Sequence, residues 1–201
     1  MKAPAIAGLI LCGGASRRMG SPKALLMLDG QTFADRLIES FRSCSPVVVV
    51  LGHESRRIRA GLARELDVIC SVNPDPERGM LSSLQTGLMA LPPDLDAVIF
   101  TPVDYPAIQP STVQALAHAF ASNSAPVIRP LYASERGHPV CVSRALMTEL
   151  LALPTTAQAR DVVRAYRAQT HYVQVNDPGI LQDIDYLEDY LHLQASMAAV
   201  R

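Results

Sequence analysis

Continuous apolar runs alternate with segments of helical periodicity through the first half of the chain. The runs that predict β-strands lie at 6–12, 46–51, 67–72 and 97–101. The 46–51 run is apolar without alternation, so both faces of that strand are predicted to be covered. Between the runs, amphipathic segments predict helices at about 33–43, 54–65 and 80–88, the first capped by Thr32. This order predicts right-handed β-α-β units and a largely parallel sheet.

The second half is less regular. Predicted helices lie at 111–122 (capped by Ser111), 144–153, 157–168 and 186–193. Predicted strands lie at 125–129, 139–142 and 171–175, the first two flanking a hairpin-like loop. The tail from Gln194 is expected to fray.

Length and composition narrow the class of protein. The 201 residues suit one domain spanning 1–201, and 49% of them are hydrophobic, as in a globular chain. A formal net charge of -1 argues against nucleic-acid binding driven by overall charge. No apolar run reaches membrane-spanning length, and no signal peptide is visible. The four cysteines lack C-x-x-C spacing, so a reduced, cytoplasmic protein is expected; they are Cys12, Cys44, Cys70 and Cys141.

The chain is organised around a glycine-rich, cationic loop that follows the first strand. Its distinctive residues are Gly13, Gly14, Ser16, Arg17, Arg18, Gly20 and Lys23. Glycines without a Cβ let the backbone approach anionic oxygens, and the cations supply full charges. The loop matches neither a Walker A loop nor a dinucleotide fingerprint. It therefore indicates a nucleotide by another route, and the alternative is a solvated basic turn.

Carboxylates follow later strand-like runs. Ligands of an open parallel sheet bind outside the carboxyl ends of its strands, where the 73–79 loop and Asp104 are also expected. Asp104 is a candidate Mg²⁺ ligand, because magnesium takes one or two carboxylates plus substrate phosphates; the alternative is a turn aspartate bonded to its own backbone. Asp185 is the natural second carboxylate, and Asp183 competes for that place.

These motifs resemble the molybdenum cofactor nucleotidylyltransferases, or MobA-like NTP transferases, over nearly the whole chain. The matching segments are 11–23, 73–74, 79–84, 102–106, 137–140, 183–185 and 188–190. The resemblance implies an α/β fold: a Rossmann-like three-layer sandwich of the nucleotide-diphospho-sugar transferase type, with a mostly parallel sheet and a small β lobe. It also implies an enzyme that moves NMP from an NTP to an acceptor phosphate and releases pyrophosphate.

The same resemblance implies roles for individual residues. Those that would line the base and ribose are Leu11, Cys12, Gly13 and Gly14. Those that would hold the triphosphate are Ser16, Arg18 and Lys23. Asn73 with Ser82 or Ser83 would contact the nucleoside, and helix capping is the alternative for the serines. Asp104 and Asp185 would carry Mg²⁺ or Mn²⁺. Lys23, Arg18 and Asp104 would be catalytic, and His138 would border the acceptor or be an ordinary polar loop residue.

The nucleotide and the acceptor stay open in the sequence. Cys12-Gly13-Gly14 is nearer the guanylyl enzymes, whereas the 137–140 and 177–181 segments are nearer the cytidylyl enzymes, which favours CTP narrowly over GTP. Molybdopterin is the expected acceptor, and a client molybdoenzyme is a candidate partner. Alternatives are transfer to a sugar phosphate or methylerythritol phosphate, and a non-catalytic chaperone that binds nucleotide or cofactor.

Overall fold

The computed structural model describes residues 3–16, 18–123, 125–154 and 156–198. The strands are β1 (Ile6–Cys12), β2 (Met27–Leu28), β3 (Gln31–Thr32), β4 (Val47–Leu51), β5 (Ile69–Val72), β6 (Ala97–Pro102), β7 (Val127–Tyr132), β8 (Glu135–Arg136), β9 (Val140–Ser143) and β10 (Thr170–Gln174). The helices are α1 (Phe33–Ser40), α2 (Ser55–Gly61), α3 (Met80–Met89), α4 (Pro110–Ser122), α5 (Arg144–Ala152), α6 (Ala159–Ala165) and α7 (Leu187–Ala198).

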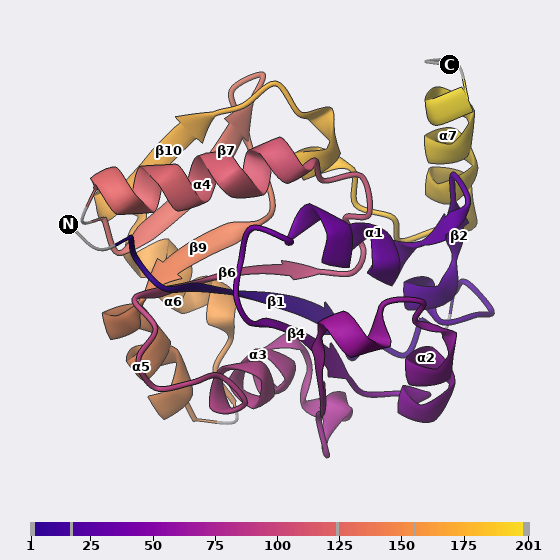
Figure 1. Ribbon diagram of the computed structural model, residues 1–201, viewed down its shortest axis with the longest axis horizontal. Coiled ribbons are helices and arrows are strands. Elements are labelled where there is room, and N and C mark those ends of the chain that lie inside the picture. The colour runs from indigo at the N-terminus through magenta and orange to yellow at the C-terminus, as the bar shows by residue number, and fades with distance from the viewer. Residues whose placement is uncertain (1–2, 17, 124, 155, 199–201) are drawn as a thin grey trace.

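One sheet runs through the middle of the molecule (Figure 1). Its strand order is β10-β7-β9-β6-β1-β4-β5, and β8 pairs with β7. The pairs from β6 through β1 and β4 to β5 are parallel, as is β10 with β7. Only β9, among the described strands of this path, runs antiparallel to its neighbours β6 and β7. The mostly parallel sheet predicted from the sequence is confirmed, and β9 reverses because it returns directly after β7 and β8.

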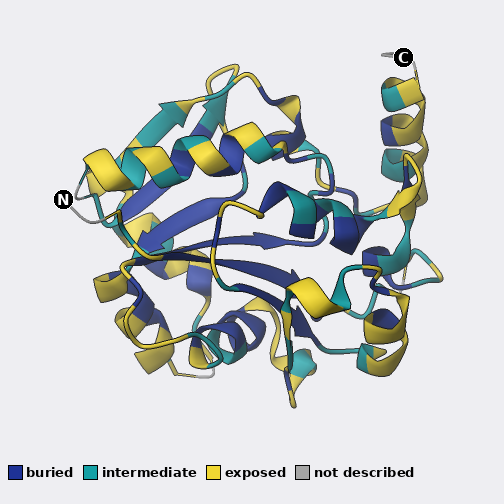
Figure 2. Ribbon diagram, in the orientation of Figure 1, coloured by how far each residue is buried: buried dark blue, intermediate teal, exposed yellow. Residues whose placement is uncertain are grey.

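Two hydrophobic clusters cover the two faces of the sheet. Along β1, Ile10 and Cys12 belong to the cluster that also contains Phe33 of α1, while Leu9 and Leu11 belong to the cluster with α3 and α5. Successive side chains of a strand point to opposite faces, so a continuous apolar strand serves both clusters. The dark-blue strands in Figure 2 lie between helices whose outer faces are exposed. The predicted three-layer α/β arrangement is confirmed.

The parallel pairing of β1 with β6 places two loops side by side. Leu11 is the register partner of Pro102, and Val103 N donates to Leu11 O at 3.0 Å. The segments that leave the two strands, the glycine loop and the turn with Asp104, therefore start at the same edge of the sheet. This is the edge expected for ligands of an open α/β sheet.

The chain after β10 returns to this edge through a buried aspartate. Asp177 is 1% exposed, and its Oδ2 accepts hydrogen bonds from Thr112 Oγ1 at 2.6 Å and from Gln109 N at 2.9 Å. Farther along, Ile184 N donates to Asp104 O at 3.0 Å. These bonds hold the 183–185 segment beside Asp104.

Several helix ends differ from the sequence prediction. Helix α4 begins at Pro110 with Gln109 as its N-cap, so Ser111 is not the cap, because Asp177 binds the Gln109 N–H from a distant part of the chain. Helix α2 ends at Gly61 rather than near residue 65, and a 3-10 turn follows at Glu65–Asp67. Helix α1, capped by Thr32 as predicted, ends at Ser40.

The C-terminal helix extends beyond the expected point of fraying. Helix α7 continues to Ala198, because Leu193 is buried against the core and Gln194 Nε2 donates to Tyr190 Oη at 2.8 Å.

Among the described residues, no helix has the length and apolarity needed to cross a membrane.

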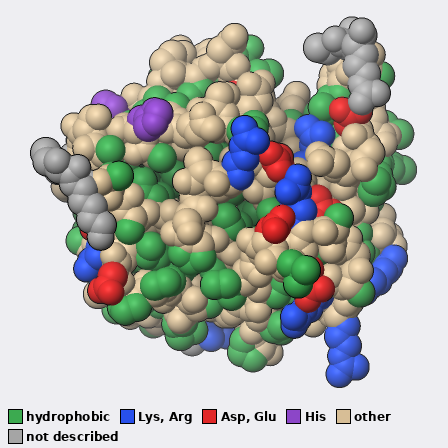
Figure 3. Space-filling model, in the orientation of Figure 1, with side chains coloured by type: hydrophobic (Ala, Val, Ile, Leu, Met, Phe, Trp, Pro, Cys, Tyr) green, Lys and Arg blue, Asp and Glu red, His purple; other side chains and the backbone are tan. Residues whose placement is uncertain are grey.

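The arginine-rich helix α2 and its surroundings form a paired, solvent-facing surface. Arg57 pairs with Glu54 at 2.9 Å, and Arg59 with Glu65 at 2.6 Å. Arg64 reaches Glu39 on α1 at 2.7 Å. Figure 3 shows blue and red side chains mixed on the face that carries α1 and α2. This pairing indicates a solvated, charge-compensated face rather than a binding patch.

Candidate active site

The glycine loop packs against the start of α3. A Cβ on Gly13 would lie 2.5 Å from Ser83 Oγ, so a side chain there would force Ser83 to move, whereas a Cβ on Gly14 would meet nothing within 4 Å. Farther along, Ser16 has a φ of 48°, a left-handed conformation uncommon for a residue with a side chain. Its Oγ accepts from Lys23 N at 3.0 Å, which closes the loop over the intervening residues. Arg17, which the sequence placed among the loop cations, lies outside the described residues.

Lys23 is buried at the head of a 3-10 turn, Lys23–Leu25, and points its charge at two carboxylates. Nζ lies 2.7 Å from Asp185 Oδ1 and 3.3 Å from Asp104 Oδ1. Burial on its own would lower the pKa of Lys23, but the two carboxylates outweigh it and hold the pKa above its ordinary value. The lysine is therefore a fixed cation inside the site.

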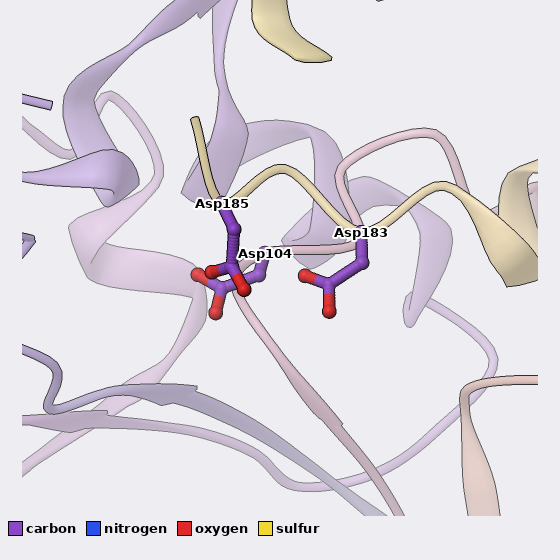
Figure 4. A group of neighbouring side chains, drawn as sticks. All are labelled: Asp104, Asp183 and Asp185. Carbon is purple, nitrogen blue, oxygen red and sulfur yellow. The ribbon is translucent and has the colours of Figure 1, made fainter. Parts of the chain in front are cut away.

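Three aspartates converge near this lysine, and Figure 4 shows their carboxylates gathered together. One ligand atom from each of Asp104, Asp183 and Asp185 lies within 4.8 Å of the others. Burial raises the pKa of Asp104 to about 6, and Lys23 offsets part of that effect. Burial, then Asp185, also raises the pKa of Asp183. Three oxygen donors at this spacing have the chemistry of a divalent-cation site.

The loop, the lysine and two of the aspartates line one cavity of about 390 Å³. The predicted site residues in its wall are Leu11, Cys12, Gly13, Gly14, Ser16, Arg18, Lys23, Ser83, Asp104 and Asp185. Further wall residues include Pro76, which lies in the 73–79 loop, and Met80, which lies in the matching segment 79–84. Ile58 of α2 also lines the cavity, and no sequence pattern marks it. The structure therefore brings together most of the residues named from the sequence.

Arg18 lies at the rim of this cavity rather than on the aspartates. Its Nη1 donates to Tyr186 Oη at 3.2 Å, and its guanidinium carbon lies 5.0 Å from the centre of the Tyr186 ring. Tyr186 directly follows Asp185 in the chain, and this neighbourhood is the one sequence signal that could have pointed to it. The arginine is thus held where it can reach into the cavity.

Asn73 and Ser82 lie behind the cavity wall, and Asn73 supports Ser83. Asn73 is 3% exposed, and its Nδ2 donates to Ser82 Oγ at 2.8 Å and to Ser83 Oγ at 3.0 Å. Neither Asn73 nor Ser82 lines the cavity, whereas Ser83 does. The N-cap of α3 is Gly79, and Ser82 Oγ donates to Gly79 O at 2.9 Å, so the serine does not act as an N-cap.

Cys12 lines the cavity as a buried thiol. Burial, then Asp104, raises the pKa of this thiol, which keeps it protonated and unreactive at neutral pH. A nucleophilic role for Cys12 has no support in this environment.

His138 lies outside this cavity and is linked to Asp183 through Tyr105. Its ring centre is 4.7 Å from that of Tyr105, whose Oη donates to Asp183 Oδ2 at 3.3 Å. Burial, then Arg129, lowers the pKa of His138 to about 4, so the imidazole is neutral at physiological pH. The preceding Gly137 is required by packing, because a Cβ there would overlap the Ile180 backbone carbonyl. Tyr105 is the connecting residue that sequence reasoning left without a role.

Comparison with known proteins shows the same fold and chemistry in its relatives. The chain is 25% identical over 189 residues to a molybdenum cofactor cytidylyltransferase of Escherichia coli, covering 93% of this chain and 94% of the relative. It is 32% identical over 103 residues to a probable molybdenum cofactor guanylyltransferase of Bacillus cytotoxicus, about half of each chain, 51% and 51%.

Solved structures have the same fold. Rv0371c from Mycobacterium tuberculosis superposes with a TM-score of 0.85 at 26% identity, covering 97% of this chain and 100% of the other. A structure of Rv0371c in complex with manganese gives 0.80 at 24% identity, covering 95% and 98%. These likenesses confirm the α/β fold expected from the sequence.

The family follows from the extent of the match. The model of the MobA-like NTP transferase domain matches residues 8–171, well over half of the chain, and this range includes the glycine loop, Lys23, Asp104 and His138. The predicted family and the predicted enzyme class are both confirmed. This chain belongs to the MobA-like NTP transferase domain family and is a nucleotidyltransferase.

Proposed function

We propose that this chain transfers a nucleotidyl group from an NTP to the phosphate of molybdopterin, with release of pyrophosphate. The observation that carries the proposal is the position of Lys23, whose ammonium lies between Asp104 and Asp185 in the cavity that the glycine loop also lines. A cavity lined by cationic side chains and by carboxylates that can bind a metal ion can hold the negative charges of a triphosphate. The relative that aligns with nearly the whole chain is a molybdenum cofactor cytidylyltransferase.

The nucleotide occupies the cavity in this proposal. Base and ribose lie against the wall built by Leu11, Cys12, Gly13 and Gly14, with Ser83 offering its hydroxyl. Asn73 acts through Ser83, because its Nδ2 donates to the Ser83 hydroxyl from behind, and Ser82 accepts from the same Nδ2 and so helps to fix Asn73. Ser16, Arg18 and Lys23 bind the triphosphate, the arginine as a planar fork and the lysine as a compact charge.

Asp104 and Asp185 are proposed to hold a divalent cation, Mg²⁺ or Mn²⁺, with Asp183 close enough to be a third ligand. The carboxylate donor set fits such an ion, which takes oxygen ligands and shares substrate phosphates. When bound, the ion would supply positive charge that stabilises the negative charge of the phosphates and of pyrophosphate.

In the transfer step, an oxygen of the acceptor phosphate attacks the α-phosphorus of the NTP. A new P–O bond forms, the bond to the bridging oxygen of the β-phosphate breaks, and its electron pair leaves with pyrophosphate. The attacking oxygen is already ionised, so no general base is needed. The chain contributes position and positive charge: Lys23 and Arg18 stabilise the charge that develops on the departing phosphates.

CTP is the proposed nucleotide and GTP the alternative. The cytidylyltransferase relative aligns over 93% of the chain, whereas the guanylyltransferase relative aligns over 51%. Calorimetric titration with CTP and GTP in the presence of Mg²⁺ or Mn²⁺ tests this choice, and tighter binding of GTP would reverse it.

The acceptor is tested by pyrophosphate release from CTP and GTP with molybdopterin, methylerythritol phosphate and sugar phosphates. Release only with molybdopterin supports the proposal. Release only with another of these phosphates would support the transfer reaction and show that this other phosphate is the acceptor. Nucleotide binding without pyrophosphate release from any acceptor would overturn the enzymatic proposal in favour of a chaperone, and a client molybdoenzyme would then be sought by co-purification.

A further inference from the structure

A second cavity, of about 370 Å³, has an arginine-rich wall. It is called here the arginine pocket, after Arg129, Arg136, Arg160, Arg164 and Arg167. His138 also lines it. Met80, at the start of α3, lines both this pocket and the cavity of about 390 Å³ that the glycine loop lines. The two cavities therefore meet at Met80. None of these five arginines belongs to the motifs that the sequence pattern singles out.

Helix α6 and the turn after it supply one side of the arginine pocket. Arg160, Val163 and Arg164 lie on one face of α6, and Arg167 lines the same pocket from the 3-10 turn Arg167–Gln169. The opposite side comes from the sheet, where Arg129 stands on β7 and Val140 on β9. The pocket thus combines apolar walls with charges from β7, β8, α6 and the turn after α6.

The positive charge of this pocket is not neutralised by the protein. In the described part of the chain, no carboxylate lies within ion-pair distance of Arg136, Arg160, Arg164 or Arg167, whereas Arg57 and Arg59 of α2 are both paired. Burial lowers the pKa of Arg129, and the nearby Arg136 lowers it further. Like charges gathered in a cavity repel one another, and a bound anion removes that cost.

Two buried polar atoms in the same wall also lack partners. Among the described residues, Arg129 Nε and His138 Nδ1 are buried without a hydrogen-bond partner. An unsatisfied buried polar atom costs free energy that a ligand can recover by bonding to it. His138 contacts Tyr105, and Tyr105 Oη bonds Asp183, so this wall reaches the aspartate cluster. A ligand here would lie next to the reaction centre.

We propose that the arginine pocket binds the acceptor substrate, an organic phosphate whose body carries further polar or anionic groups. Its anionic groups pair with the arginines, its ring system packs against Val140 and Val163, and its reactive phosphate reaches the α-phosphorus past Met80. Arg160 and Arg164 are binding residues for the acceptor and do not contact the nucleotide. This inference rests on the proposed transferase function.

The test compares two double variants that remove the same charge. Arg160→Gln with Arg164→Gln alters the pocket, and Arg57→Gln with Arg59→Gln alters the exposed face of α2. Fluorescence titration with 6-hydroxymethylpterin monophosphate measures acceptor binding, with the α,β-methylene analogue of CTP and Mg²⁺ filling the first cavity. Calorimetry with CTP and Mg²⁺ alone measures nucleotide binding. A pterin phosphate is the probe because the proposed acceptor is a phosphorylated pterin.

We expect the pocket variant to bind the pterin phosphate about tenfold more weakly for each arginine removed, while its affinity for CTP stays unchanged. The α2 variant should match the wild type in both titrations. Equal pterin binding by the pocket variant, or none by the wild type, would overturn the pocket as a pterin-phosphate site. Failure of the wild type to bind any NTP would instead contradict the proposed function. If an acceptor other than molybdopterin supports turnover, its KM is measured in the same two variants. A KM raised only in the pocket variant supports the arginine pocket as the acceptor site, and an unchanged KM in that variant overturns it.

Discussion

Lys23 Nζ and Asp185 Oδ1 lie 2.7 Å apart, although the two residues are 162 positions apart in the chain. The ion pair joins the first loop to the segment after the last strand of the sheet, and Asp104 completes it at 3.3 Å from the turn that follows β6. Two carboxylates share the single positive charge of this buried lysine, which couples the geometry of the site to its charge.

Replacing Lys23 should reduce turnover far more than it reduces binding of the acceptor. In Lys23→Met, kcat is expected to fall on the order of 10²–10³-fold, the loss typical of one charge-stabilising group in an active site. Pyrophosphate release at saturating NTP measures it. Arg42→Met, which also removes one positive charge but lies at an exposed pair with Glu39, is the control. A folded Lys23→Met protein with full turnover would remove Lys23 from the mechanism.

Lys23 should also compete with a metal ion for the aspartates. Without nucleotide, Lys23→Met is expected to bind Mn²⁺ on the order of tenfold more tightly than the wild type, because the cation that neutralises Asp104 and Asp185 is gone. Thermal unfolding with and without Mn²⁺ measures this, since a ligand of the native state raises Tm. An unchanged or smaller Mn²⁺ effect in the variant would show that lysine and metal do not share these carboxylates.

Metal binding should weaken below about pH 6. The pKa of Asp104 is raised to about 6, so this carboxylate is ionised above that pH and protonated below it. Protons then compete with the ion, and Mn²⁺ affinity should fall by roughly tenfold per pH unit under pH 6. Titration of the wild type and of Asp104→Asn at several pH values measures it. The variant should bind weakly at every pH, and a wild-type affinity that is flat from pH 7 to pH 5 would contradict the assignment.

Gly13 and Gly14 should tolerate alanine differently. Gly13→Ala places a Cβ 2.5 Å from Ser83 Oγ, which is expected to cost about 1–3 kcal/mol of stability and to raise the KM for NTP. Gly14→Ala meets nothing within 4 Å and should stay within about 0.5 kcal/mol of the wild type. Urea unfolding of both variants measures the contrast, and equal stabilities would mean that Ser83 can move away at little cost.

His138 should make the protein less stable in acid. Its folded pKa of about 4 lies below the ordinary value of 6.5. As the pH falls below 6.5, the unfolded chain therefore takes up a proton that the folded chain refuses. The loss between pH 6.5 and pH 4 should reach about 3 kcal/mol at most. The variant His138→Gln has no imidazole to protonate and should not show this loss of stability.

Urea unfolding at pH 7.5, 6 and 5 separates the loss of stability due to His138 from the losses due to other titrating groups. The wild type should lose more stability than His138→Gln over this range, so the difference between them shifts in favour of the variant as the pH falls. Parallel losses in the two proteins would mean that the pKa of His138 in the folded state is not lowered from its ordinary value.

The sequence alone determined the sheet and much of the first cavity, because these depend on local patterns. The apolar run of β1 predicts a buried strand, and its alternate residues do enter two separate clusters. Parallel strands end at a common edge, so the glycine loop and Asp104 could be placed together from chain order alone. The family resemblance rests on the same segments.

Only the tertiary structure decided which distant side chains touch. The bond from Lys23 to Asp185, the support of Ser83 by Asn73 and the contact of Tyr105 with His138 all join separate elements. The arginine pocket likewise draws on β7, β8 and α6, and in the sequence its residues look like ordinary solvated charges. Periodicity reports which face of an element is buried, whereas the partner on that face depends on how the whole chain packs.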